Sequence, residues 1–289
     1  INKNAQCLNG NSFSLTNNAT ISTGTLAYQW NFGDGNTDTA ASPSHSYIND
    51  GNYSITFIAT SNAGCTDTIV KSVEVSPMPV AKWSVNNNTQ CLRGNSFSFS
   101  DSSIIKTGSL KWSWDFGNGL FDSISNPVVI YNTAQLYNVE LTVTSDKGCV
   151  SKAAGVVTVN ANPIATINAN GSLNLCDGKN VLLKTVAGYL YQWMKNNANI
   201  SGAIDSMLTV SASGDYKVVV SSLAGCADTS SNVTVTVSPK SNFGSFTGNT
   251  SVNANSTQTY SVVNVSGVTY NWTVSGGIVL SGQGSNAAQ

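Results

Sequence analysis

The stretch "QWNFGDGN" at residues 29–36 places a tryptophan and a phenylalanine on alternate positions and then breaks into glycine and aspartate. It returns almost unchanged as "SWDFGNGL" at residues 113–120, an offset of 84 residues. The same offset superimposes "QCLNGNSFSL" (6–15) on "QCLRGNSFSF" (90–99) without a gap. One domain has therefore been copied along the chain.

Each copy has the pattern of short strands. Apolar residues alternate in runs such as Tyr28, Trp30 and Phe32, which is typical of a strand with one buried face. Gly-, Asn- and Asp-containing turns separate these runs, and no helical spacing of apolar residues persists. The sequence predicts an all-β fold of antiparallel sandwiches, with Trp30 in the core and Gly33 at a tight turn.

Two further units follow the copied pair. The third keeps the same order of motifs, with "YQWMKNN" at residues 191–197, and the fourth shows "YNWTVSGG" at residues 270–277. We predict domains at 1–78, 79–161, 162–238 and 239–289, the first without its N-terminal strand and the fourth without its second half. We expect the chain to be a window on a longer repetitive polypeptide. Proline in the short junctions favours an extended, semi-rigid string.

The composition argues against several classes of partner. Of the 289 residues 9% are charged, and the net charge is −1; the usual charged share is about 25%. Scattered basic residues offer no footprint for nucleic acid or an anionic membrane, and no apolar run reaches the ~20 residues of a membrane span. We expect neither nucleic-acid binding nor membrane insertion in this segment.

Residues for catalysis are scarce. His45 is the only histidine, no C-x-x-C occurs, and no carboxylate pair recurs. We predict no enzyme activity, no catalytic or metal site and no cofactor, with a structural role for His45. Asp34 and Asp38 flank a glycine turn and offer oxygen ligands for calcium. Asp34 becomes Asn118 in the second copy, which favours ordinary turn chemistry.

The motif "WNFGDG" (30–35), followed by "SPSHSY" (42–47), "DGNYSITF" (50–57) and "GCTD" (64–67), closely resembles the PKD domain. This is an immunoglobulin-like sandwich of extracellular proteins. The tyrosine that enters an alternating strand in each unit resembles the tyrosine corner of such folds. These tyrosines are Tyr53, Tyr137 and Tyr216.

The third unit resembles immunoglobulin-like modules of large surface proteins from Bacteroidota. The resemblance implies a cell-surface, gliding-adhesin-like protein exported by the type IX secretion system. Its implied partners are export machinery, cell-surface anchor proteins and extracellular glycans or surfaces.

The six cysteines fall two to a unit. Equal spacing in the first two copies favours pairing within each unit, although sequence alone allows about 15 connectivities. Such bonds imply an oxidising, extracellular setting, and the alternative is three pairs of free buried thiols. The expected pairs are Cys7 with Cys65, Cys91 with Cys149, and Cys176 with Cys226.

Two further sets of residues are candidate sites. Asp-Ser/Thr-aliphatic triplets resemble the O-glycosylation motif of exported Bacteroidota proteins, with chance occurrence as the alternative. Their hydroxyls belong to Thr39, Thr68, Ser123 and Ser206. Trp83 and Trp112 are the least constrained tryptophans and therefore candidate platforms for stacking on sugars, although core packing is favoured.

The leading hypothesis is a non-enzymatic stalk or spacer segment of a large secreted cell-surface adhesin that serves attachment or gliding. One alternative is an immunoglobulin-like module that itself binds a glycan or protein. Another is an accessory region of a secreted hydrolase, because PKD units often accompany chitinases and proteases.

Overall fold

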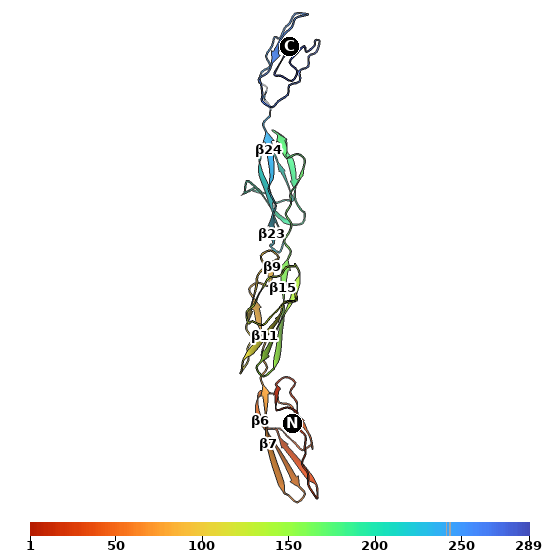
Figure 1. Cartoon of the computed structure of the whole chain (residues 1–289), viewed down its shortest axis with the longest axis vertical. Coiled ribbons are helices and arrows are strands. Elements are labelled where there is room, and N and C mark those ends of the chain that lie inside the picture. Colours follow the sequence, from red (N-terminus) through yellow and green to blue (C-terminus); the bar gives the residue numbers. More distant parts are fainter. Residues whose placement is uncertain (241, 243) are drawn as a thin grey trace. The chain divides into compact units, whose positions relative to one another are not determined.

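The computed structural model describes residues 1–240, 242 and 244–289, and none of these residues lies in a helix. The all-β prediction is confirmed, with successive sandwiches along the chain (Figure 1). The chain divides into two compact units, residues 1–162 with 224–226, and residues 163–223 with 227–289. The first unit contains two sandwiches.

The first sandwich pairs a five-stranded sheet, in the order β1-β7-β6-β3-β4, with the two-stranded sheet β2-β5. Strands β3, β6 and β7 are antiparallel, whereas β1 runs parallel to the end of β7. Its strands are β1 (Ala5–Cys7), β2 (Phe13–Ser14), β3 (Leu26–Asn31), β4 (Thr37–Asp38), β5 (Ser44–His45), β6 (Gly51–Ser61) and β7 (Thr66–Ser76).

The second sandwich repeats this plan with a sheet β12-β11-β14-β15-β9 and a sheet β13-β10-β8. Strand β9 is parallel to the end of β15, as β1 is to β7. Its strands are β8 (Trp83–Val85), β9 (Thr89–Cys91), β10 (Phe97–Asp101), β11 (Leu110–Asp115), β12 (Phe121–Asp122), β13 (Val128–Val129), β14 (Leu136–Ser145) and β15 (Val150–Asn160).

The third sandwich has a sheet β17-β24-β22-β19-β20, with β23 on β22, and a sheet β16-β18-β21. Its strands are β16 (Asn168–Asn170), β17 (Asn174–Cys176), β18 (Val181–Lys184), β19 (Leu190–Lys195), β20 (Ala198–Asn199), β21 (Met207–Val210), β22 (Gly214–Ser221), β23 (Ala227–Thr229) and β24 (Val233–Ser238). Beyond it, β25 (Tyr260–Ser261) pairs with β26 (Ala287–Ala288).

A buried tryptophan organises the core of each complete sandwich, as the sequence predicts. A buried indole N–H needs an acceptor, and each donates to a backbone carbonyl ten or twelve residues further along the chain. The pairs are Trp30 to Ala40 (3.0 Å), Trp114 to Ile124 (3.0 Å) and Trp193 to Asp205 (2.8 Å).

The tyrosine corners are also confirmed. Each tyrosine hydroxyl donates to the carbonyl four residues earlier, which fastens the loop to the strand that follows it. The pairs are Tyr53 to Asn49 (3.0 Å), Tyr137 to Thr133 (2.9 Å) and Tyr216 to Ala212 (2.9 Å).

The cysteine pairing expected within each unit is wrong. The structure has disulfides Cys7–Cys149 and Cys91–Cys226, and Cys65 and Cys176 are free thiols. In the first sandwich Cys7 lies beside Ser76 at the end of β7, whereas Cys65 immediately precedes β7. Eleven residues of strand separate these ends by about 35 Å at ~3.3 Å per residue. Disulfide-bonded Cα atoms lie within about 7 Å, so one sandwich cannot bond its own two cysteines.

A comparison of Gly33→Ala with Gly35→Ala tests whether the close approach of the backbone at Gly33 requires glycine there. Both glycines have positive φ, +80° and +96°, which costs about 1 kcal/mol for alanine. A Cβ on Gly33 meets the carbonyl oxygen of Ser54 at 2.7 Å, whereas one on Gly35 has nothing within 4 Å. We expect Gly33→Ala to cost about 1–3 kcal/mol more than its control.

Hydrogen exchange of the β3 and β6 peptides, followed by mass spectrometry, measures this difference locally in the first sandwich. Equal protection in the two variants would contradict the steric explanation.

Candidate functional site

The most distinctive chemical feature is a pair of disulfides that each join one repeat to the next. We call Cys7, Cys91 and Cys176 the first-position cysteines, and Cys65, Cys149 and Cys226 the second-position cysteines. In both bonds a first-position cysteine is joined to the second-position cysteine of the following repeat, with Cα–Cα distances of 5.5 and 5.4 Å. These distances lie in the usual range for disulfides.

Parallel pairing places the first-position cysteines. Each lies on a three-residue strand opposite the last residue of the final long strand, where the chain leaves the sandwich. The backbone N–H of the residue after each first-position cysteine donates to the carbonyl of the last residue of that long strand. These bonds are Leu8 to Ser76 (2.9 Å), Leu92 to Asn160 (2.8 Å) and Asp177 to Ser238 (2.9 Å).

A hairpin turn places the second-position cysteines. The N–H of Cys149 donates to the Ser145 hydroxyl at 3.0 Å, and the N–H of Ser145 donates back to the Cys149 carbonyl at 2.9 Å. Gly148, at φ +84°, closes the turn with a conformation that favours glycine. The turn thus places this thiol at one end of the sandwich, and the first-position cysteine of the same sandwich lies at the other end.

Two ion pairs accompany the bond between the first and second sandwiches. Lys147 Nζ lies 2.9 Å from Glu74 Oε1, and Lys106 Nζ lies 2.8 Å from Asp50 Oδ2. The hydrogen bond from Lys147 lowers the pKa of the Glu74 carboxyl and raises that of Lys147. Exposed ion pairs contribute little stability, so the disulfide dominates this junction. Sequence reasoning missed these pairs, since their members lie in different repeats.

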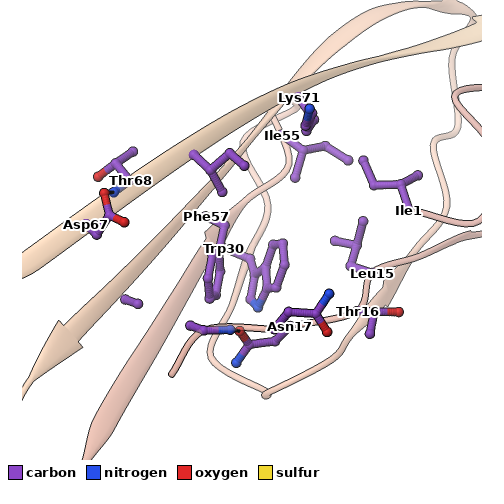
Figure 2. Close-up of a pocket in the computed structure, with 14 residues that line it drawn as sticks. Ile1, Leu15, Thr16, Asn17, Trp30, Ile55, Phe57, Asp67, Thr68 and Lys71 are labelled. Carbon is purple, nitrogen blue, oxygen red and sulfur yellow. Dashed lines mark hydrogen bonds between the residues drawn. The ribbon is translucent and has the colours of Figure 1, made fainter. Parts of the chain in front are cut away.

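The first sandwich has an open groove of about 340 Å³ between β6, β7 and the loop after β2. Figure 2 shows Trp30 and Phe57 side by side on its floor, with Leu15 and Ile55 beside them. Exposed Asp67, Thr68 and Lys71 form its rim.

The second sandwich fills the equivalent space with Trp83 from β8. The Trp83 ring lies 6.0 Å from that of Trp114, the counterpart of Trp30. The Trp83 ring also lies against Gly155, the counterpart of Lys71. A Cβ on Gly155 would come within 2.5 Å of this ring. The groove therefore corresponds to a core position rather than to a pocket with its own chemistry.

Neither candidate stacking tryptophan presents a bare ring. Trp83 packs on Phe99 at 5.5 Å between ring centroids, and its indole N–H donates to the Ala153 carbonyl at 3.1 Å. Trp112 is half-buried against the same core and donates to Asp101 Oδ2 at 2.8 Å. Both rings thus contribute to packing, as the favoured interpretation requires.

The turn at Asp34 is occupied by its own hydrogen bonds. Asp34 Oδ2 lies 2.8 Å from His45 Nε2, and Asp34 Oδ1 accepts the Asn36 N–H at 3.0 Å. His45 stacks on Phe32 with ring centroids 4.0 Å apart. Asp38 Oδ1 accepts the Ala40 N–H at 2.7 Å. Within residues 1–240, 242 and 244–289, no three His, Cys, Asp or Glu side chains gather as metal ligands would.

The glycosylation candidates differ in exposure. Thr39, Thr68 and Ser123 are exposed, and Ser206 is half-buried. Asp67 accepts the backbone N–H of Thr68, and Asp122 accepts that of Ser123. Modification of these hydroxyls stays a prediction.

The chain is similar in sequence to known protein families and to a known protease. The family model described as PKD domain matches residues 1–77 and 76–159, and that described as PKD-like domain matches residues 239–289. A pre-pro-metalloprotease, PrtV of Vibrio cholerae serotype O1, is 28% identical over 130 residues. That match covers 44% of this chain and 14% of the protease.

Two solved structures are similar over single domains. The PKD1 domain of Vibrio anguillarum Epp is 34% identical, covering 29% of this chain and 95% of that one, with a TM-score of 0.26. The PKD1 domain of Vibrio cholerae PrtV is 31% identical, covering 29% and 98%, with a TM-score of 0.26. In the part of the chain that the structure describes, no helix is long and apolar enough to cross a membrane.

The disulfide pairing predicts the outcome of non-reducing peptide mapping. We expect peptides joined through Cys7–Cys149 and Cys91–Cys226, because only these thiols are brought together. Closing a loop of this size stabilises the fold by about 5 kcal/mol on the chain-entropy model. Recovery of Cys7 joined to Cys65 would contradict the arrangement.

The Asp34–His45 contact predicts a difference in acid sensitivity. Burial raises the pKa of the Asp34 carboxyl, but hydrogen bonds from His45 and Asn36 outweigh it, so the pKa lies below its usual value. A carboxyl with a lowered folded-state pKa stabilises the fold above its unfolded-state pKa of about 3.9 and loses that effect as pH falls. We therefore expect Asp34→Asn to flatten the loss of stability on acidification.

Calorimetric unfolding between about pH 2 and pH 6 measures this slope. The matched control is Asn118→Asp, which introduces the carboxyl in the second sandwich where Val129 replaces the histidine. An equally steep slope in wild type and Asp34→Asn would refute the assignment.

Proposed function

Because this chain belongs to the PKD domain family, we propose that it is a non-enzymatic, load-bearing spacer segment of a secreted cell-surface adhesin. The observation that carries the proposal is that disulfides bond the first repeat to the second and the second to the third, which gives these junctions a second covalent connection besides the peptide linker. Two attachments at a junction restrict bending and twisting far more than one, which suits a stalk.

The bonds also limit how far the chain extends under tension. The shortest covalent path from residue 1 to residue 289 runs through 1–7, crosses to 149, returns to 91, and crosses to 226. This path contains about 130 residues, at most about 460 Å at ~3.6 Å per residue. Residues 8–90 and 150–225 lie outside it and bear no load when it is taut. The disulfides therefore limit the fully extended chain to less than half the length that it would reach without them.

In this proposal the chain contains four modules, with bounds 1–78, 79–161, 162–238 and 239–289. Proline-bearing junctions such as residues 75–83 add stiffness to the linkers. Disulfides persist in oxidising compartments, which supports an extracellular location.

The finer assignment rests on the resemblance of the third unit to surface modules of Bacteroidota. In this proposal type IX machinery exports the protein, a surface anchor holds it, and it serves attachment or gliding over glycans or other surfaces. The exposed residues Thr39, Thr68 and Ser123 suit O-glycosylation of such an exported stalk.

A second candidate is an accessory region of a secreted hydrolase. The likeness to the Vibrio cholerae metalloprotease over 130 residues favours it. Peptides of a protease domain in the native protein, together with proteolytic activity, would select this candidate over the stalk. A glycan-binding role has less support, because the candidate tryptophans pack against the core.

Single-molecule stretching between residues 1 and 289 tests the load-bearing role. We expect the oxidised chain to reach a contour length of about 460 Å, and the Cys7→Ala/Cys91→Ala variant, which lacks both cross-links, about 1,000 Å. The variant keeps every strand, so it isolates the effect of the bonds. Equal contour lengths of the oxidised chain and the variant would refute this disulfide connectivity.

Small-angle scattering of the oxidised chain supplies an independent check. A stalk gives an elongated particle whose maximum dimension is stable to buffer changes. A compact, multi-lobed particle would overturn the spacer function.

A further inference from the structure

Two thiols remain outside the described disulfides, and they occupy complementary positions in the repeat. Cys65 is a second-position cysteine and Cys176 is a first-position cysteine, and both are exposed. Their equivalents are all bonded: Cys149 and Cys226 for the former, Cys7 and Cys91 for the latter. The free pair thus comprises one of each kind.

The turn that carries Cys65 has the same geometry as the turn that carries bonded Cys149. The Cys65 N–H donates to the Ser61 hydroxyl at 3.0 Å, and the Ser61 N–H donates to the Cys65 carbonyl at 2.8 Å. The Cys149 turn has these bonds at 3.0 and 2.9 Å. Gly64 and Gly148 precede the two cysteines with φ of +82° and +84°. The backbone turn at Cys65 therefore already has the conformation of the turn that carries the bonded Cys149.

The strand that carries Cys176 likewise matches those of the bonded first-position cysteines. Cys176 pairs with Ser238 in the parallel ladder, as Cys7 pairs with Ser76. The N–H after Cys176 donates to the Ser238 carbonyl at 2.9 Å, the same distance as at Cys7. Cys176 needs no rearrangement of its strand to bond.

Burial distinguishes the bonded from the free second-position cysteines. Cys149 is 1% exposed and Cys226 is 0% exposed, whereas Cys65 is exposed in an equivalent turn. The uncovered surface at Cys65 is the surface that a bonded repeat covers at Cys149.

We propose that Cys65 and Cys176 are open ends of a continuing disulfide series, each a covalent docking site for another PKD repeat. Cys65 bonds a first-position cysteine, and Cys176 bonds a second-position cysteine. The partner repeat belongs to the same polypeptide or to a second copy of this chain, and the thiol chemistry is the same for both. This pairing rule does not depend on the adhesin assignment.

Formation of each bond requires a disulfide oxidant. The thiolate of one cysteine attacks a sulfur of the oxidant's disulfide and forms a mixed disulfide, releasing one thiol of the oxidant. The second cysteine's thiolate then displaces the remaining thiol. Two cysteine thiols are oxidised, one oxidant disulfide is reduced to two thiols, and the protons pass to those thiols. Oxidised glutathione or a thiol oxidoreductase supplies this chemistry.

The test mixes two single variants of this chain, Cys65→Ala and Cys176→Ala, in oxidised glutathione. Each variant keeps one open end, so only the mixture contains both kinds. We expect the heterodimer joined through Cys176 and Cys65 to exceed the two homodimers together by several-fold. Indiscriminate oxidation of exposed thiols gives equal amounts and would overturn the pairing rule. Peptide mapping of Cys7–Cys149 and Cys91–Cys226 in each variant verifies that it has folded.

Native protein from its source gives the second measurement, after alkylation and non-reducing digestion. A Cys65 peptide joined to a cysteine outside residues 1–289 of the same protein supports the rule and identifies a neighbouring repeat. A Cys65 peptide joined to the Cys176 peptide supports it and identifies a second copy. Alkylated thiols or adducts with small thiols at both positions would overturn the proposal.

Discussion

The length of the central hairpin strand is the constraint on which the rest of the structure depends. Strand β7 has eleven residues and separates the cysteine before it from the parallel strand that pairs with its end. A buried tryptophan and a tyrosine corner hold this hairpin against the rest of the sandwich. Each repeat therefore has one cysteine at each of its two ends, and both disulfides of the described residues join neighbouring repeats.

This placement gives the disulfides a different task from the usual one in small secreted domains. In small secreted domains the disulfides compensate for a hydrophobic core that is too small to stabilise the fold. Here each sandwich already has a core with a buried tryptophan, such as Trp114 at 0% exposure. The bonds instead connect finished domains, beside ion pairs such as Lys147 with Glu74. The packing inside each sandwich and the stiffness of the junction thus depend on separate sets of residues.

The repeat and the period-two pattern carry enough information to predict the sandwiches, the buried tryptophans and the tyrosine corners. They could not reveal the cysteine pairing. In a gapless repeat every pairing rule yields equal spacing, so the equal separations of Cys7 from Cys65 and of Cys91 from Cys149 do not favour one rule. The deciding contact is the parallel pairing of Cys7 with Ser76, which joins residues far apart in sequence and has no local signature. The packing of Trp83 over Gly155 depends on the same kind of long-range approach.

The sequence separation within each bond also governs when it forms. Cys149 follows Cys7 by 142 residues, and Cys65 lies between them. In a chain made from its N-terminus, the incorrect partner reaches Cys7 first. When the first sandwich folds, Cys65 is held at the far end of β7 from Cys7. Cys7 can then bond only after the next repeat has been made. Correct assembly consequently requires that folding precede oxidation, repeat by repeat, in the direction of synthesis.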